Sequence, residues 1–321
     1  MGLSRSPIMR ILITGASGCI GHYLVETLLQ ETDCNLVLVA RNPAKLKLAG
    51  LVPPRVEIVT ADLRDLEGLA SILGTIDTAI LAATAWGDPQ ETLTVNVENT
   101  LQLMQRLNPQ RCQQILYFST ASILDYDHHL LPQAGELGTD YIRSKYECYR
   151  RLQTLDNLPP LTIIFPTLVL GGDTHKPASH ISAGLPDALK WAGLARWFRT
   201  EGSFHFLHAR DIAQVVSYLA THPSRDRREF ILGNPAISAN ALIGDLCDLA
   251  NKPIRRQISL TPWLTNGIIK LFRIQMAPWD RFCMAKRHLT HRHPVTPANF
   301  GLTPYCPTLK DAFRLAGLPR R

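Results

Sequence analysis

The sequence lacks any apolar run close to the length that crosses a membrane. Spanning a bilayer takes roughly 18 consecutive apolar residues, and no stretch of this 321-residue chain approaches that. The N-terminus also has no apolar signal-peptide core. We therefore expect a cytoplasmic protein rather than an integral membrane protein. Residues 1–8 are interpreted as a disordered overhang, although Met1–Ser6 fits the loose N-myristoylation pattern at Gly2.

Paired cysteine motifs are absent as well. The seven cysteines are odd in number and scattered, and no two of them have CxxC spacing. This pattern is typical of free thiols in a reducing compartment and not of a disulfide framework. We expect no metal site.

Acidic residues are scarce at the C-terminal end. Residues 251–321 hold thirteen lysines and arginines against two aspartates, a net charge of +11, whereas residues 1–250 carry −4. No nucleic-acid motif accompanies this charge, so we expect no specific nucleic-acid partner. Within it, 261–274 has apolar residues at helical spacing beside basic ones. An anionic membrane surface or an acidic protein would fit such a helix, but packing of the apolar stripe over the substrate cleft is the favoured interpretation.

Short apolar runs alternate with helical periodicity through the first half of the chain. This alternation predicts an α/β fold, a Rossmann-type doubly wound parallel sheet covered by helices on both faces. We expect a dinucleotide-binding body over 9–170. Residues 171–321 would form a smaller, mixed substrate-side region that completes the sheet in part and ends in the basic segment 251–321. The expected strands are 10–14, 35–40, 56–60, 78–81, 114–118 and 161–165, and the expected helices 20–29, 93–107, 141–153 and 211–221.

Three glycines follow the first expected strand at GxxGxxG spacing. Gly15, Gly18 and Gly21 lie between that strand and a helix. Glycines permit a tight turn and close approach of a pyrophosphate, and the helix N-terminus offers free N–H groups to it. The pattern predicts a dinucleotide site.

Residues at the ends of the next strands predict the type of dinucleotide. Arg41 ends the second strand, where an arginine pairs with a 2′-phosphate and an acid would favour NAD. We therefore expect NADP, with NAD as the alternative. Asp62 ends the third strand and would accept a hydrogen bond from adenine or cap a helix. The small residues Ala82–Ala85 would let the backbone approach the cofactor.

Tyr141 and Lys145 stand one helical turn apart. A free phenol has a pKa near ~10, and a lysine on the same helix face lowers the cost of the phenolate. We expect Tyr141 to act as a general acid/base. Ser119 and Thr120 end the fifth strand at the same rim, and Ser122 is a competing hydroxyl for holding a substrate oxygen.

Seven motifs in order resemble the short-chain dehydrogenase/reductase superfamily, specifically its extended branch, the NAD-dependent epimerase/dehydratase family. The resemblance covers most of residues 9–250. The motifs are Thr14–Gly21, Ala61-Asp62-Leu63, Asn96–Thr100, Phe118-Ser119-Thr120, Tyr141–Lys145, Pro166–Gly171 and Phe206–Ala213.

The resemblance implies a role for several residues. Thr120, Tyr141 and Lys145 would be catalytic, with Thr120 orienting the substrate oxygen. Asn96 would lie ahead of the helix beside the site, and Asp211 would be a structural acid. The cofactor-binding positions implied by the motifs and strand ends are Gly15, Ser17, Gly18, Cys19, Ile20, Gly21, Arg41, Asp62, Leu63, Ala82, Ala83, Thr84, Tyr141, Lys145, Pro166 and Val169.

Departures from the family pattern lie on the substrate side. Phe165 stands where members often have arginine, and Leu124-Asp125 where they often have Tyr-Gly. The interval from Thr120 to Tyr141 is also short. We therefore favour NADPH-dependent reduction of a carbonyl on a small molecule, or its reverse. The alternatives are a sugar-nucleotide epimerase or dehydratase, and a non-catalytic NADP-binding scaffold that uses the basic tail. The oligomeric state stays open, with a dimer as one alternative.

Overall fold

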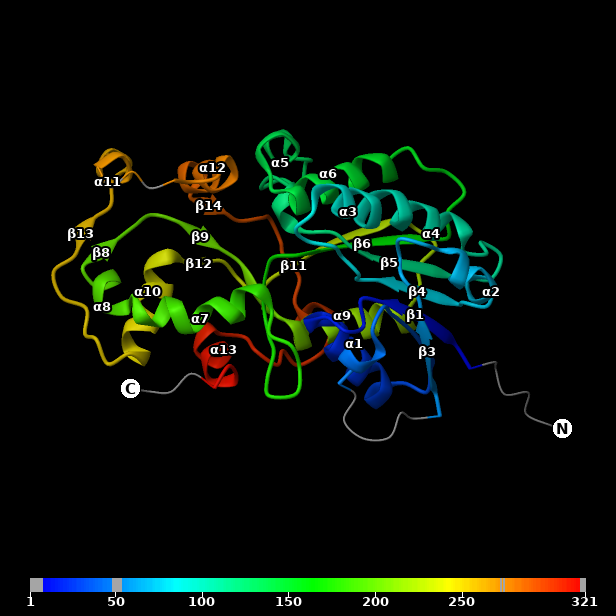
Figure 1. The fold of residues 1–321 in the computed structure, drawn as a ribbon. Helices are drawn as coiled ribbons and strands as arrows, with labels where there is room; N and C mark the ends of the chain where they lie inside the picture. The colour runs from blue at the N-terminus through cyan, green and yellow to red at the C-terminus, as the bar shows by residue number, and fades with distance from the viewer. Residues whose placement is uncertain (1–7, 48–53, 272, 274, 318–321) are drawn as a thin grey trace.

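Seven parallel strands form the central sheet. The computed structural model describes residues 8–47, 54–271, 273 and 275–317. The strand order is β11-β6-β5-β4-β1-β2-β3, and every neighbouring pair is parallel (Figure 1). The predicted Rossmann-type α/β fold is confirmed. The strands are β1 (Arg10–Thr14), β2 (Asn35–Ala40), β3 (Val56–Thr60), β4 (Thr78–Leu81), β5 (Gln114–Phe118), β6 (Leu161–Pro166) and β11 (Arg228–Leu232).

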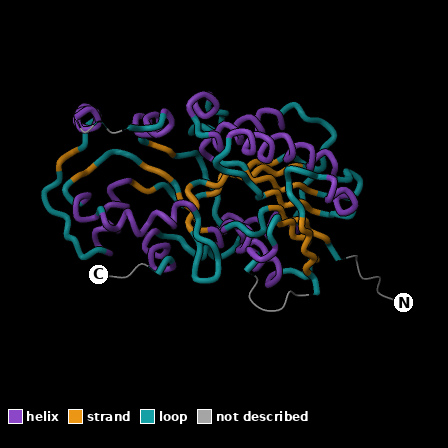
Figure 2. Tube along the Cα trace, in the orientation of Figure 1, coloured by secondary structure: helices purple, strands orange, loops and turns teal. Residues whose placement is uncertain are grey.

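Helices cover both faces of this sheet (Figure 2). One face packs against α1 (Cys19–Glu31) and α9 (Ala209–Thr221), whose apolar sides share a core with the strands. The other face packs against a second core. None of the helices in the described part of the chain is long and apolar enough to cross a membrane. The helices on the second face are α2 (Ala70–Leu73), α3 (Pro89–Leu93), α4 (Thr100–Arg106), α5 (Pro132–Leu137) and α6 (Asp140–Leu152).

The helix predicted over 93–107 is not one continuous α-helix. It begins earlier, as α3, and continues as a π-helical segment, η3 (Thr94–Asn99), before α4. The Thr100 hydroxyl donates to the Val95 carbonyl five residues earlier, at 2.8 Å. The widened turn contains Asn96, which is fully buried and hydrogen-bonded outside its helix. A π-helical turn often occurs where a side chain serves a site.

The order of the strands determines where along the sheet a ligand can bind. The sheet runs outward from β1 in one direction through β2 and β3, and in the other through β4 and β5. Loops that leave the carboxyl ends of β1 and β4 therefore diverge to opposite sides, and open sheets of this kind bind ligands where the strand order reverses in this way. The glycine turn after β1 and Ala82–Ala85 after β4 both lie at this point.

A second lobe extends from the carboxyl edge of the sheet (Figure 1). Its core is built around Phe206, Leu246, Cys247 and Phe313. The paired strands β7 (Leu168–Leu170) and β10 (Phe206–His208) connect it to the sheet. The lobe consists of α7 (His180–Lys190), α8 (Ala192–Ala195), β8 (Phe198–Arg199), β9 (Ser203–Phe204), β12 (Ile237–Ser238), α10 (Ala239–Leu249), β13 (Ile258–Ser259), α11 (Pro262–Leu271), α12 (Pro278–Lys286), β14 (His288–Leu289) and α13 (Leu309–Leu315).

The prediction that 261–274 forms a helix is confirmed, whereas the prediction that its apolar stripe is buried is wrong. A helix forms there, α11, but Trp263 is 83% exposed and Leu271 is 76% exposed. The sequence periodicity predicted the helix correctly, whereas it could not show that no other element covers these two side chains. Phe272 of the predicted stripe and Ile274 at the end of the predicted segment lie outside the described residues, as does Gly2 with nearly all of the overhang predicted over 1–8.

All seven cysteines lie within the described residues and are unpaired. Burial raises the pKa of several of them, including Cys112 and Cys148, to about 11. Buried thiols with a raised pKa stay protonated and unreactive at neutral pH.

Asp211 binds the C-terminal segment to the lobe that contains the central sheet, here called the sheet lobe. Its carboxylate is fully buried on α9 and accepts hydrogen bonds from the backbone N–H groups of Tyr305, at 2.6 Å, and Cys306, at 3.1 Å. Burial raises the pKa of Asp211 to about 6, although both hydrogen bonds favour the ionised form. The residue that the resemblance described as a structural acid thus joins two segments far apart in the chain.

We expect Asp211→Ala to lower the free energy of unfolding by about 2–5 kcal/mol, because it leaves two buried N–H groups without acceptors. Asp211→Asn keeps one acceptor oxygen and should lose less. Urea unfolding of the three proteins measures the difference. Equal stability of the alanine variant and the wild type would show that the two hydrogen bonds to Asp211 do not contribute to the free energy of unfolding.

Candidate active site

The glycine turn has no room for side chains at two positions. Gly15 has φ +76°, and a Cβ there would lie 2.6 Å from the Ala83 nitrogen. At Gly21 a Cβ would lie 2.1 Å from the Gly15 carbonyl oxygen. Gly18 caps α1 without a side-chain cap, and no acidic residue occupies the first turn. The turn therefore leaves N–H groups of the helix N-terminus open to an anion.

The other predicted residues lie in the turn and at the start of α1. Ser17 in the turn and Cys19 and Ile20 in the helix are half-buried. Burial is the main reason that the pKa of Cys19 rises to about 12, and nearby Asp173 raises it further. Cys19 is thus a packing residue at neutral pH.

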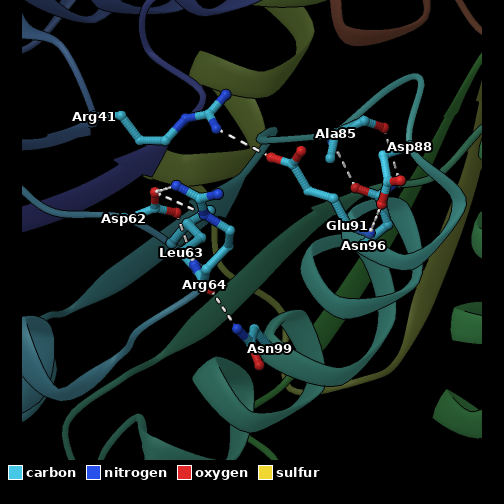
Figure 3. A network of polar contacts seen from close by, with 9 residues as sticks. All are labelled: Arg41, Asp62, Leu63, Arg64, Ala85, Asp88, Glu91, Asn96 and Asn99. Carbon is cyan, nitrogen blue, oxygen red and sulfur yellow. Dashed lines mark hydrogen bonds and ion pairs between the residues drawn. The ribbon is translucent and has the colours of Figure 1, made fainter.

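Asn96 ties the loop after β4 to the helix that carries Tyr141. Its side-chain oxygen accepts from the Ala85 N–H at 2.8 Å and from the Thr84 hydroxyl at 3.2 Å. Its amide nitrogen donates to the Ala85 carbonyl at 3.1 Å and to the Ser144 hydroxyl at 3.0 Å. Ser144 in turn donates to the Tyr141 carbonyl at 2.7 Å. Figure 3 shows Asn96 turned toward Ala85.

Arg41 and Asp62 lie at the rim beyond β2 and β3, and each is already ion-paired. Arg41 donates to Glu91 of α3 at 3.2 Å, and Asp62 accepts from Arg64 at 2.6 Å (Figure 3). Arg64 is the main reason that the pKa of Asp62 is lowered. The Leu63 carbonyl accepts from Asn99 at 2.6 Å. Arg64 and Glu91 did not emerge from the sequence, because their importance comes from these partners.

Thr120 and Tyr141 meet at the carboxyl end of β5. Thr120 lies close enough to the phenol to lower the pKa of Tyr141, although burial raises that pKa by more. Thr120 also accepts from the Ser122 N–H at 3.3 Å, so Ser122 contributes backbone to the turn. Ser119 is buried, and its hydroxyl has no partner among the described residues.

Lys145 lies one turn after Tyr141 and is buried, but it does not act as expected. Its ammonium donates to the Phe118 carbonyl at 2.7 Å and lies 4.9 Å from the centre of the Tyr117 ring. Burial lowers the pKa of Lys145 to about 8 and raises that of Tyr141 to about 12. The expected lowering of the Tyr141 pKa by Lys145 is therefore not seen: burial raises that pKa, and Lys145 is not among the groups that shift it.

Trp86 covers Tyr141, and sequence reasoning missed it. The two rings are stacked, with centroids 3.8 Å apart and planes 14° from parallel. Trp86 is 58% exposed, and His180 of α7 stacks with it at 6.2 Å. Its position directly after Ala82–Ala85 was the one available signal. A large aromatic side chain thus separates part of Tyr141 from solvent.

Pro166 and Val169 lie where the chain passes from β6 into β7. Pro166 is buried at the end of β6, and Val169 is half-buried against the core that contains α1. Ala82 packs against the same core. The fold thus brings the ends of β1, β4, β5 and β6 to one edge, where most of the predicted site residues lie.

Comparison with known proteins identifies the family. The model of the NAD-dependent epimerase/dehydratase family matches residues 11–233. The chain belongs to this family. A sterol demethylase protein B from Methylococcus capsulatus is 27% identical to the chain over 275 residues, which are 82% of this chain and 81% of that protein.

Solved structures share the fold of this epimerase/dehydratase family member. The crystal structure of gox2253 has a TM-score of 0.69 at 22% identity and covers 96% of this chain and 99% of its own. The Bordetella bronchiseptica enzyme WbmG, in complex with NAD and UDP, has a TM-score of 0.67 at 17% identity, with 98% and 94% covered. At these identities the likeness concerns the fold.

We expect Trp86→Ala to lower the pKa of Tyr141 from about 12, because removing the stacked ring admits water and reduces the desolvation penalty on the phenolate. Tyrosinate absorbance over a pH titration measures it, and subtraction of the same titration for Trp86→Ala/Tyr141→Phe assigns the signal. Trp86→Phe keeps a ring on Tyr141 and should shift the pKa less. An unchanged titration in Trp86→Ala would mean that the stack does not shield Tyr141.

Proposed function

We propose that the chain is an NADPH-dependent oxidoreductase that reduces a carbonyl group on a small molecule or catalyses the reverse reaction. The observation that carries this proposal is the placement of three groups at the carboxyl edge of the sheet: Tyr141, the nearby Thr120, and Lys145 one turn later on α6, whose ammonium donates to the Phe118 carbonyl at 2.7 Å. A scaffold that only bound the dinucleotide would not need this arrangement of a phenol, a hydroxyl and an ammonium group.

The turn after β1 would hold the cofactor. A Cβ at Gly15 or Gly21 would collide with backbone, so the turn suits close approach of a pyrophosphate to the N-terminus of α1. Arg41, with Arg64 beside it, would contact a 2′-phosphate. When bound, NADPH supplies the hydride for the reduction.

The side chains at the carboxyl edge of the sheet would donate the proton that the carbonyl oxygen takes up during reduction. Tyr141 donates its phenolic proton to the carbonyl oxygen as that oxygen gains negative charge, and Thr120 donates a hydrogen bond that steadies the phenolate left behind. Lys145 adds a positive charge beneath the site. A tyrosine whose pKa is about 12 stays protonated at neutral pH, which suits proton donation and hence the direction of reduction.

Two buried side chains favour this reaction over the sugar-nucleotide alternative. Phe165 is fully buried against Tyr149, and Leu124 is 2% exposed, so neither offers a polar group to a sugar. The ring stacked on Tyr141 is that of Trp86, which presents an exposed aromatic face beside the phenol. The relative named sterol demethylase protein B also supports an apolar substrate with a hydroxyl or ketone. The UDP bound to WbmG supports the epimerase or dehydratase alternative.

Purified protein should consume NADPH on at least one member of a panel of apolar ketones, and Tyr141→Phe should lower kcat by roughly 100- to 10,000-fold, the usual contribution of a general acid. The ring and its stacking on Trp86 remain in this variant, so NADPH affinity should be preserved. Cofactor absorbance measures turnover and cofactor fluorescence measures binding.

Two outcomes would contradict the proposed reaction. Tightly bound cofactor with no net consumption, together with conversion of a sugar nucleotide, would assign the epimerase or dehydratase reaction instead. Full activity of Tyr141→Phe would remove the assigned proton donor.

We expect Arg41→Ala to weaken NADPH binding by about 10- to 100-fold, since one charge-assisted hydrogen bond to phosphate is lost, and to change NADH binding little. Glu91→Gln is the matched variant: it frees Arg41 from the ion pair seen at 3.2 Å and should strengthen NADPH binding. Fluorescence titration with both cofactors measures the two effects. Equal losses for NADPH and NADH in Arg41→Ala would rule out recognition of the 2′-phosphate.

A further inference from the structure

The outer end of the second lobe carries a cluster of positive charges that form no ion pair within the described residues. From Asn251 to Trp279 the chain has five basic residues and no acidic one. All five are exposed, and no ion pair joins them to an acid within the described residues. We call this region, residues 252–271 together with Arg273, the α11 surface. Its basic residues are Lys252, Arg255, Arg256, Lys270 and Arg273.

Large apolar side chains are exposed on the same surface. Trp263 and Leu271 of α11 are 83% and 76% exposed, and Ile258 and Ile254 are 57% and 44% exposed. The pairing of β13 with β8 extends the region to Trp197, which is 38% exposed and whose carbonyl accepts from the Ile258 N–H at 2.8 Å. Single exposed apolar residues are ordinary, whereas several in one short segment indicate a contact surface.

The arrangement fits the surface of an anionic bilayer. Tryptophan is favoured at the boundary between headgroups and acyl chains, because one ring carries both an apolar body and a polar N–H. Lysines and arginines around it are attracted to anionic headgroups. A short helix with apolar and basic residues lies in the plane of such a surface without crossing it.

The same charges disfavour a second copy of this chain as the partner. A two-fold interface places one patch against its own copy. The α11 surface, whose own segment has no acidic residue, would then oppose five positive charges with five others. Such like-charge pairing is repulsive.

We propose that the α11 surface docks on anionic membranes, with Trp263 and Leu271 entering the headgroup region and the basic residues contacting lipid phosphates. Figure 1 shows α11 and β13 at the end of the molecule opposite β3. A membrane bound there leaves the dinucleotide edge of the sheet free. The proposal goes beyond the proposed oxidoreductase activity and does not depend on it.

The test is co-sedimentation of the full chain with vesicles of phosphatidylcholine alone or mixed with phosphatidylserine. We expect binding to the mixed vesicles only, weakened by salt because exposed charges are screened. Lys252→Gln/Arg255→Gln/Arg256→Gln should bind roughly 100-fold more weakly, since each basic residue contributes about five-fold. Trp263→Ser/Leu271→Ser should also lose binding, and Trp263→Phe should retain most of it.

A matched control removes the same net charge from the sheet lobe. Arg106→Gln/Arg111→Gln/Arg150→Gln alters exposed arginines that pair with Glu67, Asp77 and Glu147, and it should bind vesicles as the wild type does. Unfolding temperature and NADPH affinity, measured for every variant, should stay unchanged because the altered residues lie outside the site.

Three results would overturn the proposal. They are equal binding to both kinds of vesicle, unchanged binding of both α11 variants, and loss of binding in the control to the same extent. Self-association that the α11 variants abolish, without vesicle binding by the wild type, would assign the surface to a second copy instead.

Discussion

The buried amide of Asn96 holds together two parts of the chain on which the site depends. It bonds to the loop after β4 through Ala85 and to α6 through Ser144. That loop carries Trp86 and that helix carries Tyr141, so the amide joins the two segments whose rings are stacked. A buried amide without these partners would be costly, so the π-helical turn that presents Asn96 is stabilised by the contacts it makes.

Burial, more than charge pairing, determines the protonation of this protein's interior. It raises the pKa of Tyr141 to about 12, lowers that of Lys145 to about 8 and raises that of Asp211 to about 6. Each shift favours the neutral form, as expected for groups removed from water. Lys145 and Asp211 both keep hydrogen-bond partners, so neither is a buried ionisable group without a polar contact.

The two ends of the molecule have different physical characters. At the sheet, charges meet in pairs, as Arg41 does with Glu91 and Asp62 with Arg64. At the outer end of the second lobe, the basic residues of 252–273 form no ion pair within the described part of the chain and lie among exposed apolar side chains such as Trp263. The C-terminal basicity is thus a feature of one surface and not of the site. The segment after α11 returns to the sheet lobe, where Asp211 holds it.

The sequence by itself determined the sheet, the order of its elements and the glycine turn, because strand and helix periodicity and glycine spacing are local properties of the chain. Six strands were predicted within a residue of their ends, and the turn follows from two positions that exclude a Cβ. Tertiary structure decided which groups are in contact. It stacks Trp86 on Tyr141, places the Lys145 ammonium on the Phe118 carbonyl, and leaves Trp263 and Leu271 of α11 exposed. These contacts join segments distant in the chain, and burial, which sets their pKa values, exists only once the segments have packed.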